Sequence, residues 1–168
     1  MSRKTDIEAL FNRANTTLQK IISEYDNSLN SQTISADLRI DIKDYFSNIR
    51  SILDYIAHDI VDKYCPKANP KNHLYFPIRA NLNRFTTEMS KSYPELVTNN
   101  KTVYDILENL QPFKKDEAGW LTFFNQLNNE NKHERLVTQI RTETKNVTVT
   151  GQGGGSITWG QVLHLEVE

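Results

Sequence analysis

The chain has 168 residues, of which 38% are hydrophobic and 10% are aromatic, and this size and composition predict a single domain with a real core. Its formal net charge is −1 and its pI is near 6.4. These values argue against generic electrostatic binding to nucleic acid, so such binding would require a local basic face.

Cys65 is the only cysteine, which excludes an intrachain disulfide and fits a reducing compartment. The polar residues 1–6 are followed by no apolar run, so a secretory signal is not expected. No stretch approaches the roughly 18 apolar residues of a membrane span. We therefore expect a cytoplasmic protein without a membrane partner.

Two long helices are predicted at the start of the chain. Residues 5–26 carry apolar side chains at helical spacing. Residues 35–64 form a second helix, which Ser35 caps and Pro66 ends, because the residue before a proline disfavours helix. A helix this long suggests an antiparallel partner, which the first helix supplies. The predicted apolar stripe of the second helix consists of Leu38, Ile42, Phe46, Ile49, Leu53, Ile56 and Ile60.

The middle of the chain predicts shorter elements. Residues 66–80 form a proline-containing loop whose apolar segment, 74–78, should pack onto the helices. Short helices are predicted at 81–92 and 102–110, and a longer one at 116–135. The predicted buried stripe of this late helix consists of Trp120, Phe123, Phe124 and Leu127.

The pattern changes to period two near the end of the chain. Residues 146–150, 157–159 and 162–167 alternate between apolar and polar, around a glycine-rich turn, which indicates two or three strands. We predict a mainly α protein, an up-and-down helical bundle over residues 1–140, with a small C-terminal antiparallel β appendage over 141–168. Because the last strand pattern runs to the final residue, a trimmed chain and a missing final element both remain open.

Three polar residues of the second helix form the first candidate site. Arg50, Asp54 and His58 follow one another at steps of four, so each can contact the next. Asp54 could orient His58 and raise its pKa by opposite charge, as an acid–base histidine requires. The alternative is a solvated face with an ordinary Arg50–Asp54 pair, because charged helix residues are mostly exposed.

The end of the late helix supplies four candidate binding residues. Asn131 stands where the next apolar residue is expected, and its amide could bridge two helices. Lys132, His133 and Arg135 follow within a turn. If the two helices pack together, Asn131 and His133 join the polar residues of the second helix in one cluster. The alternative is a frayed helix end, where asparagines and basic residues are natural.

Metal and cofactor sites have little support. No spacing such as Cys-x-x-Cys or His-x-x-x-His occurs, and the glycine run lacks the Lys-Ser/Thr of a phosphate-binding loop. Cys65 precedes a proline at a helix end, as a structural thiol would. We therefore expect neither a metal nor a cofactor.

Four short motifs together resemble a family of uncharacterised bacterial and phage proteins, over about residues 38–140. The resemblance implies an intact fold and a prokaryotic or phage origin, and it implies no activity. The motifs are Asn48-x-Arg50-Ser51-x-Leu53-Asp54-x-x-Ala57, Phe76-Pro77-Ile78, Leu110-Gln111-Pro112-Phe113, and Leu127-Asn128 followed by Lys132-His133-x-x-Leu136.

The helical part also resembles the HEPN superfamily (higher eukaryotes and prokaryotes nucleotide-binding). This resemblance implies a small helical bundle, often a homodimer, and ribonuclease activity on RNA, with His58 as the acid–base and Arg50 as the phosphate contact. The superfamily's arginine and histidine lie closer together than here, where seven residues separate Arg50 from His58. At the shorter spacing, Leu53 stands where the arginine would be.

Two function hypotheses follow. The first is a HEPN-like helical protein in RNA handling or bacteria–phage conflict, acting as a metal-independent ribonuclease. The second is a non-catalytic protein-interaction or structural module, in which the polar cluster only fixes helix register. Exposure separates the two, because a site needs the cluster to line a pocket or a dimer cleft, whereas a register device is sealed and fully hydrogen-bonded.

Overall fold

The structure is a computed structural model that describes residues 3–114, 119–133, 140–150 and 156–166, with side chains for 3–114 and 119–130. The mainly helical class is confirmed, because the described ranges contain six helices. None of these helices combines the length and the hydrophobicity needed to span a membrane.

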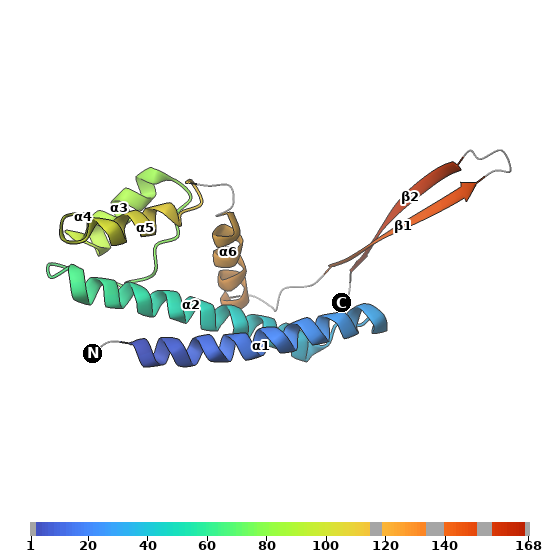
Figure 1. Cartoon of the computed structure of the whole chain (residues 1–168), viewed down its shortest axis with the longest axis horizontal. Coiled ribbons are helices and arrows are strands. Elements are labelled where there is room, and N and C mark those ends of the chain that lie inside the picture. Colours follow the sequence, from blue (N-terminus) through green and yellow to red (C-terminus); the bar gives the residue numbers. More distant parts are fainter. Residues whose placement is uncertain (1–2, 115–118, 134–139, 151–155, 167–168) are drawn as a thin grey trace.

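The helices α1 (Lys4–Ser31) and α2 (Ala36–Tyr64) pack side by side and run antiparallel (Figure 1). The Ser35 hydroxyl accepts the Leu38 N–H at 3.0 Å, so the predicted start of α2 is confirmed. The first helix is longer than predicted, because the polar residues after 26 continue it until Gln32 adopts a left-handed conformation at φ 56°.

Three short helices cover the C-terminal half of α2: α3 (Leu82–Ser92), α4 (Leu96–Asn99) and α5 (Lys101–Asn109) (Figure 1). The predicted helices at 81–92 and 102–110 are confirmed as α3 and α5. Asparagine side chains cap both, since Asn81 accepts the N–H of residue 84 and Asn100 that of residue 103. The four-residue α4 was not predicted, because it is too short to show a periodic pattern.

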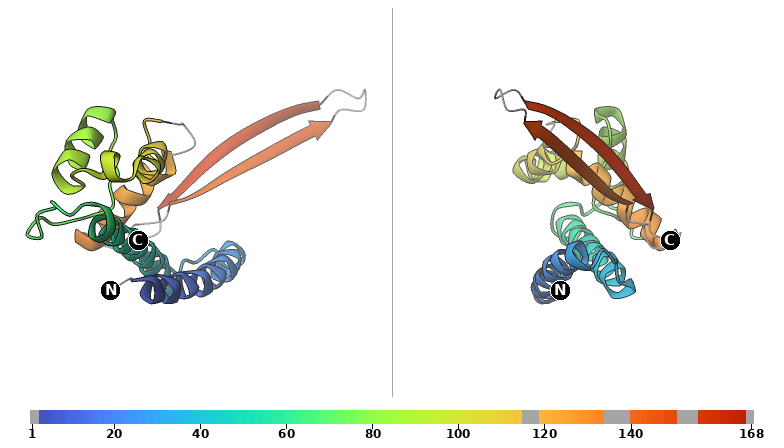
Figure 2. Two further views of the ribbon diagram at one scale, coloured as in Figure 1. Left: turned by 60° about the vertical axis from the view of Figure 1, so that its left-hand side comes forward. Right: turned by 90° about the vertical axis from the view of Figure 1, so that its right-hand side faces the viewer.

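The last described helix, α6 (Trp120–His133), crosses α2 (Figures 1 and 2). Its predicted buried stripe is wrong at two positions, since Trp120 is 55% and Phe123 is 69% exposed. The helix is rotated so that Leu121 and Phe124 face the core, and the Phe124 ring lies 5.8 Å from that of Phe46 on α2. Within the described residues, the up-and-down arrangement therefore holds for α1 and α2, while α6 crosses α2.

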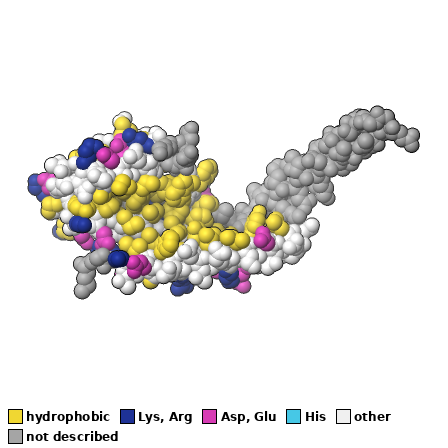
Figure 3. All heavy atoms as spheres, in the orientation of Figure 1, with side chains coloured by type: hydrophobic (Ala, Val, Ile, Leu, Met, Phe, Trp, Pro, Cys, Tyr) yellow, Lys and Arg dark blue, Asp and Glu magenta, His cyan; other side chains and the backbone are white. Residues whose placement is uncertain are grey.

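The core lies between α2, the loop before α3, and helices α3 to α6. The predicted packing of the 74–78 segment onto the helices is confirmed, because Phe76, Pro77 and Ile78 are buried. Apolar side chains also gather on the surface where α2 meets α5 and α6 (Figure 3). The buried core residues are Ala57, Cys65, Phe76, Ile78, Phe85, Met89, Tyr93, Leu96, Leu107, Leu121 and Phe124.

Two strands follow, β1 (Ile140–Thr150) and β2 (Ser156–Glu166), which pair antiparallel with residue 144 opposite residue 162. The hairpin points away from the helices in Figures 1 and 2. It is described by its backbone, and the small β appendage over 141–168 stays a prediction.

Candidate functional site

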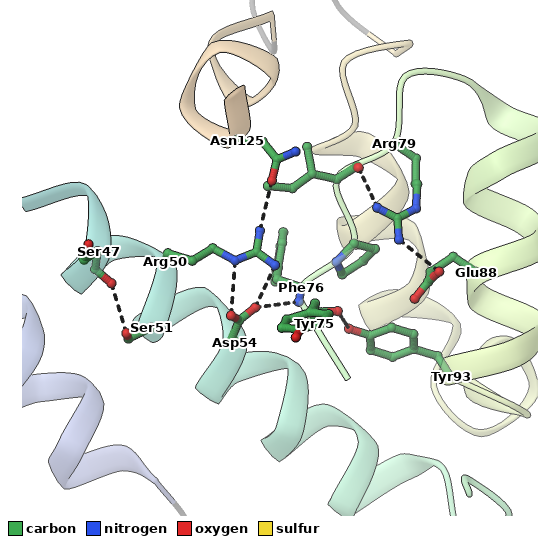
Figure 4. Close-up of polar contacts among 12 residues, drawn as sticks. Ser47, Arg50, Ser51, Asp54, Tyr75, Phe76, Arg79, Glu88, Tyr93 and Asn125 are labelled. Atoms are coloured by element: carbon green, nitrogen blue, oxygen red, sulfur yellow. Dashed lines mark hydrogen bonds and ion pairs between the residues drawn. The ribbon is translucent and has the colours of Figure 1, made fainter. Parts of the chain in front are cut away.

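Arg50 and Asp54 form a bidentate ion pair on α2. Their spacing of four residues predicted this contact. The Arg50 Nε lies 3.1 Å from Asp54 Oδ2, and Nη2 lies 3.0 Å from Oδ1. The remaining Nη1 donates to Asn125 Oδ1 on α6 at 3.4 Å (Figure 4). Arg50 is buried at 9% exposure, so its charge depends on these partners. The alternative of a solvated face is therefore wrong for Arg50.

The same pair holds the loop between α2 and α3. Asp54 Oδ1 also accepts the backbone N–H of Phe76 at 2.9 Å, and the Arg50 guanidinium lies over the Tyr75 ring at 5.6 Å. The hydroxyl of Tyr93, the residue that follows α3, donates to the Tyr75 carbonyl at 2.8 Å (Figure 4). Through one buried pair, α2 is thus fixed to the loop and to α6.

The Tyr93 hydroxyl stays protonated and remains a donor in this network. Burial is the largest cause that raises its pKa above the ordinary value, followed by the nearby carboxylates of Glu88 and Asp54, while Arg50 acts in the opposite direction. The network is hydrogen-bonded and its arginine is buried, as in a register device, while Asp54 is half-buried and Tyr75 is exposed.

His58 lies one turn after Asp54 but does not join it. Both Asp54 oxygens are directed to Arg50 and to the loop, and among the residues that the structure describes His58 makes no hydrogen bond. The His58 side chain instead lines a separate cavity of about 350 Å³, together with Cys65 and Ser92. The expected orientation of His58 by Asp54 is absent from this structure, and its catalytic role stays a prediction.

Cys65 is a buried thiol in the wall of the same cavity. Burial, and to a smaller extent the charge of Glu95, raises the pKa of Cys65 to about 11. Cys65 is therefore protonated at neutral pH, which suits the structural thiol that the sequence predicted and not a nucleophile.

The predicted binding residues at the end of α6 are described only in part. Asn131, Lys132 and His133 lie in the last turn of a helix that contacts α2, but their side chains lie outside the described residues. Arg135 lies outside the described residues altogether. The expectation that Asn131 and His133 face α2 stays a prediction.

Two other asparagines of α6 were missed. Asn128 is 2% exposed and follows Leu121 and Phe124 at helical steps, so it is an amide within the buried line. Asn125 reaches Arg50. The spacing of Asn128 from Leu121 could have signalled its burial, whereas nothing in the sequence pairs Asn125 with a residue on a distant helix.

Gln111, from the Leu110–Phe113 motif, is another buried polar residue that sequence reasoning passed over. It is fully buried, and its amide nitrogen donates to the carbonyls of Pro77 and Leu107 at 2.9 and 2.8 Å. Its oxygen accepts the N–H of Arg79 at 2.9 Å. Gln111 therefore ties the chain after α5 to the Phe76–Ile78 motif, so both motifs maintain the fold.

A groove of about 640 Å³ lies between α3, residues 78–80 and α6. On one side, Arg79 pairs with Glu88 at 3.0 Å and donates to the Ile78 carbonyl at 2.9 Å (Figure 4). Asn125 stands on the opposite wall, so this groove adjoins the Arg50–Asp54 pair. The groove therefore has basic side chains on α3 and, through Asn125, contacts the Arg50–Asp54 pair that the sequence predicted.

Two cations in this groove have no counterion. Arg84 and Lys91 lie on the exposed face of α3, two turns apart, and neither pairs with a carboxylate within the part of the chain whose side chains are described. Glu88 is already occupied, since it binds Arg79 and accepts the Ser92 hydroxyl at 3.0 Å. The groove therefore favours an anionic ligand, although the chain as a whole carries a net charge of −1.

In the ranges described, no group of three or more His, Cys, Asp or Glu residues is placed to hold a metal ion. The resemblances to a bacterial and phage family and to HEPN proteins stay predictions. Comparisons with protein-family models, with curated proteins and with solved structures found no match to this chain.

Proposed function

We propose that this protein is a HEPN-like helical protein of bacteria or phage that handles RNA, and that it does so by binding the strand in the groove between α3 and α6. The observation that carries the proposal is that, among the residues whose side chains are described, Arg84 and Lys91 pair with no carboxylate and the groove's one carboxylate, Glu88, is neutralised by Arg79. A basic surface of this kind supplies the local contact that nucleic acid needs on a protein without net positive charge.

The geometry favours binding over cleavage. Arg50, the expected phosphate contact, is buried and committed to Asp54 and Asn125. Asp54, the expected partner of His58, is occupied by Arg50 and by the loop N–H of Phe76. Without an orienting partner, His58 lacks the arrangement that acid–base catalysis requires.

The test measures binding of a fluorescent single-stranded RNA by anisotropy over a range of salt concentrations. Replacing Arg84 and Lys91 together by glutamine should weaken binding and reduce the slope of log K against log salt by roughly 0.7, the value for one lost phosphate contact on a single strand. The matched control replaces Arg13 and Lys63, which are exposed on α1 and α2, by glutamine. Equal effects of the two double variants, or no binding by the unmodified protein, would contradict the proposal.

The cleavage hypothesis has its own arm in this experiment. Purified protein is incubated with mixed RNA in EDTA, beside a His58→Ala variant. Cleavage that persists in EDTA and is lost in the variant would restore the metal-independent ribonuclease. We expect intact RNA in both reactions, because His58 faces a different cavity from the basic groove.

A second candidate function, a protein-interaction module, is supported by a separate feature. Phe11, Ile22, Tyr25 and Leu29 of α1 are each about half exposed, and they share one side of the helix with Leu18. Their steps of three, four and seven are those of a helix that packs against another helix. The occupant that we propose is α1 of a second copy of this chain, since identical stripes can pair across a two-fold axis.

A further inference from the structure

We propose that the groove between α3 and α6 holds one nucleoside monophosphate unit, as a free nucleotide or as the phosphorylated end of an RNA strand. This inference rests on the proposed RNA-binding role of the groove and specifies its ligand. The phosphate lies between Arg84 and Lys91, and the nucleoside lies toward Asn125 on α6.

The phosphate position follows from the face of α3. Arg84, Thr87 and Lys91 are spaced three and four residues apart, so they lie along one side of the helix, with the two cations roughly 10 Å apart along its axis. Long cationic side chains from both ends can reach a point above Thr87. The Thr87 hydroxyl donates to the Asn83 carbonyl at 2.9 Å, so the helix already fixes its position.

Glu88 is the one carboxylate among the described lining residues, and it does not prevent a phosphate from binding between Arg84 and Lys91. Glu88 is held by Arg79 at 3.0 Å and by the Ser92 hydroxyl at 3.0 Å. Its charge is therefore compensated, and the net contribution of Arg84 and Lys91 is available to an anion.

The opposite wall can read the nucleoside. Asn125 uses its side-chain oxygen to accept from Arg50 at 3.4 Å, so its orientation is set by the buried pair. Within the described residues its amide nitrogen has no partner, which leaves donors for an acceptor on a base or ribose. Thr122 adds a hydroxyl on the same wall of α6.

The size and chemistry of the groove limit its contents to one nucleotide unit, which is either free or the end of an RNA strand. A volume of about 640 Å³ is that of a small-molecule site. The described lining residues include no aromatic side chain, so successive bases have no platform there on which to stack. Charge and hydrogen bonds to a single phosphorylated nucleoside remain as the means of recognition.

The experiment titrates the full chain with AMP, UMP, adenosine and inorganic phosphate by calorimetry. We expect a nucleotide to bind at least about tenfold more tightly than adenosine or phosphate alone, because each lacks half of the contacts. Arg84→Gln and Asn125→Ala should each weaken nucleotide binding by about tenfold, and Arg13→Gln should not. Phosphate that binds as tightly as the nucleotides, or an Asn125→Ala variant that binds normally, would overturn the inference.

A second experiment distinguishes a free nucleotide from the end of an RNA strand. It also distinguishes failure of this inference from failure of the proposed function. Short RNAs with a 5′ phosphate, a 3′ phosphate or only hydroxyl ends compete against AMP. Preference for one phosphorylated end assigns the site to strand ends, and AMP binding without RNA competition assigns it to free nucleotides and removes the RNA-handling role. RNA binding that depends on Arg84 and Lys91, without AMP binding or end preference, keeps the proposed function and overturns this inference.

Discussion

At the scale of single residues, Asp54 joins α2 to the loop before α3. It neutralises the buried Arg50 and accepts the Phe76 N–H. Asp54→Asn should lower the free energy of unfolding by about 3 kcal/mol, because the guanidinium stays buried without its counterion. Chemical denaturation measures the loss.

Asp105→Asn provides the control for this prediction. Asp105 pairs with Lys101 at 2.6 Å, but both side chains are largely exposed, so removal of this charge should change stability by less than about 0.5 kcal/mol. Equal losses in the two variants would show that the Arg50–Asp54 pair is as solvated as a surface pair.

Cys65 predicts a dependence of stability on pH. Burial raises its pKa from 9.0 to about 11, so the folded protein holds the thiol proton more tightly than the unfolded chain. The resulting stabilisation is fully present below pH 9 and is lost as the pH rises toward 11. Relative to a Cys65→Ala variant, the unmodified protein should lose roughly 2–3 kcal/mol of its free energy of unfolding over this interval.

The measurement is urea denaturation of both proteins under reducing conditions at several pH values. Other titrating groups are common to the two proteins and cancel in the difference. A difference that stays constant from pH 8 to pH 11 would mean that the thiol is solvated in the folded state.

The sequence could predict the Arg50–Asp54 pair, because a step of four on one helix brings two side chains together. It could not predict the partners through which the pair connects α2 to α6 and to the loop. Asn125 is 75 residues away and the Phe76 N–H is 22 residues from Asp54. The same limit explains His58, since spacing permits contact with Asp54 but tertiary packing turns the carboxylate toward the loop.

At the scale of elements, α6 offers a test of which face is buried. Phe124 is 3% and Phe123 is 69% exposed, although the two residues are adjacent and identical in type. Phe124→Ala should destabilise the protein by about 3–5 kcal/mol, because it leaves a cavity beside Phe46. Phe123→Ala should cost less than about 0.5 kcal/mol.

Thermal and denaturant unfolding of the two variants decide between the observed face and the stripe that the sequence predicted. If both substitutions cost several kcal/mol, α6 would bury the wider face, with Trp120 and Phe123 covered. The sequence could not choose, because apolar residues at 120, 121, 123, 124 and 127 form two overlapping lines, and only the approach of α2 selects one of them.

Helix bounds were predicted best where a local signal exists. The cap at Ser35 and the proline after Cys65 set the limits of α2, and both act through neighbouring residues. The end of α1 was placed too early, because a polar segment remains helical until a residue takes up the left-handed conformation. The residue in that conformation is Gln32, so the sequence lacks the glycine that would usually mark such a helix end.

At the scale of the whole molecule, the distribution of charge matters more than its sum. A net charge of −1 suggested little affinity for nucleic acid, yet Arg84 and Lys91 line one groove and pair with no carboxylate among the side chains that the structure describes. Several other cations with described side chains are neutralised locally, as when Arg3 binds Asp59 and Asp62. The sequence showed that binding of nucleic acid would require a local basic face. It could not show where that face lies, because its position depends on how α3 and α6 pack.

The exposed stripe of α1 predicts a homodimer. Phe11, Tyr25 and Leu29 remain about half exposed although α2 covers the neighbouring side of the helix, so a second helix is needed to bury them. We expect the purified protein to be a dimer in light scattering after size exclusion. Leu29→Glu should shift it to a monomer, because two glutamates would face the seam in each dimer, whereas Asn30→Glu, one residue along on the polar side, should leave the dimer intact. A protein that is monomeric at all accessible concentrations, or a Leu29→Glu variant that still dimerises, would assign the stripe to another role.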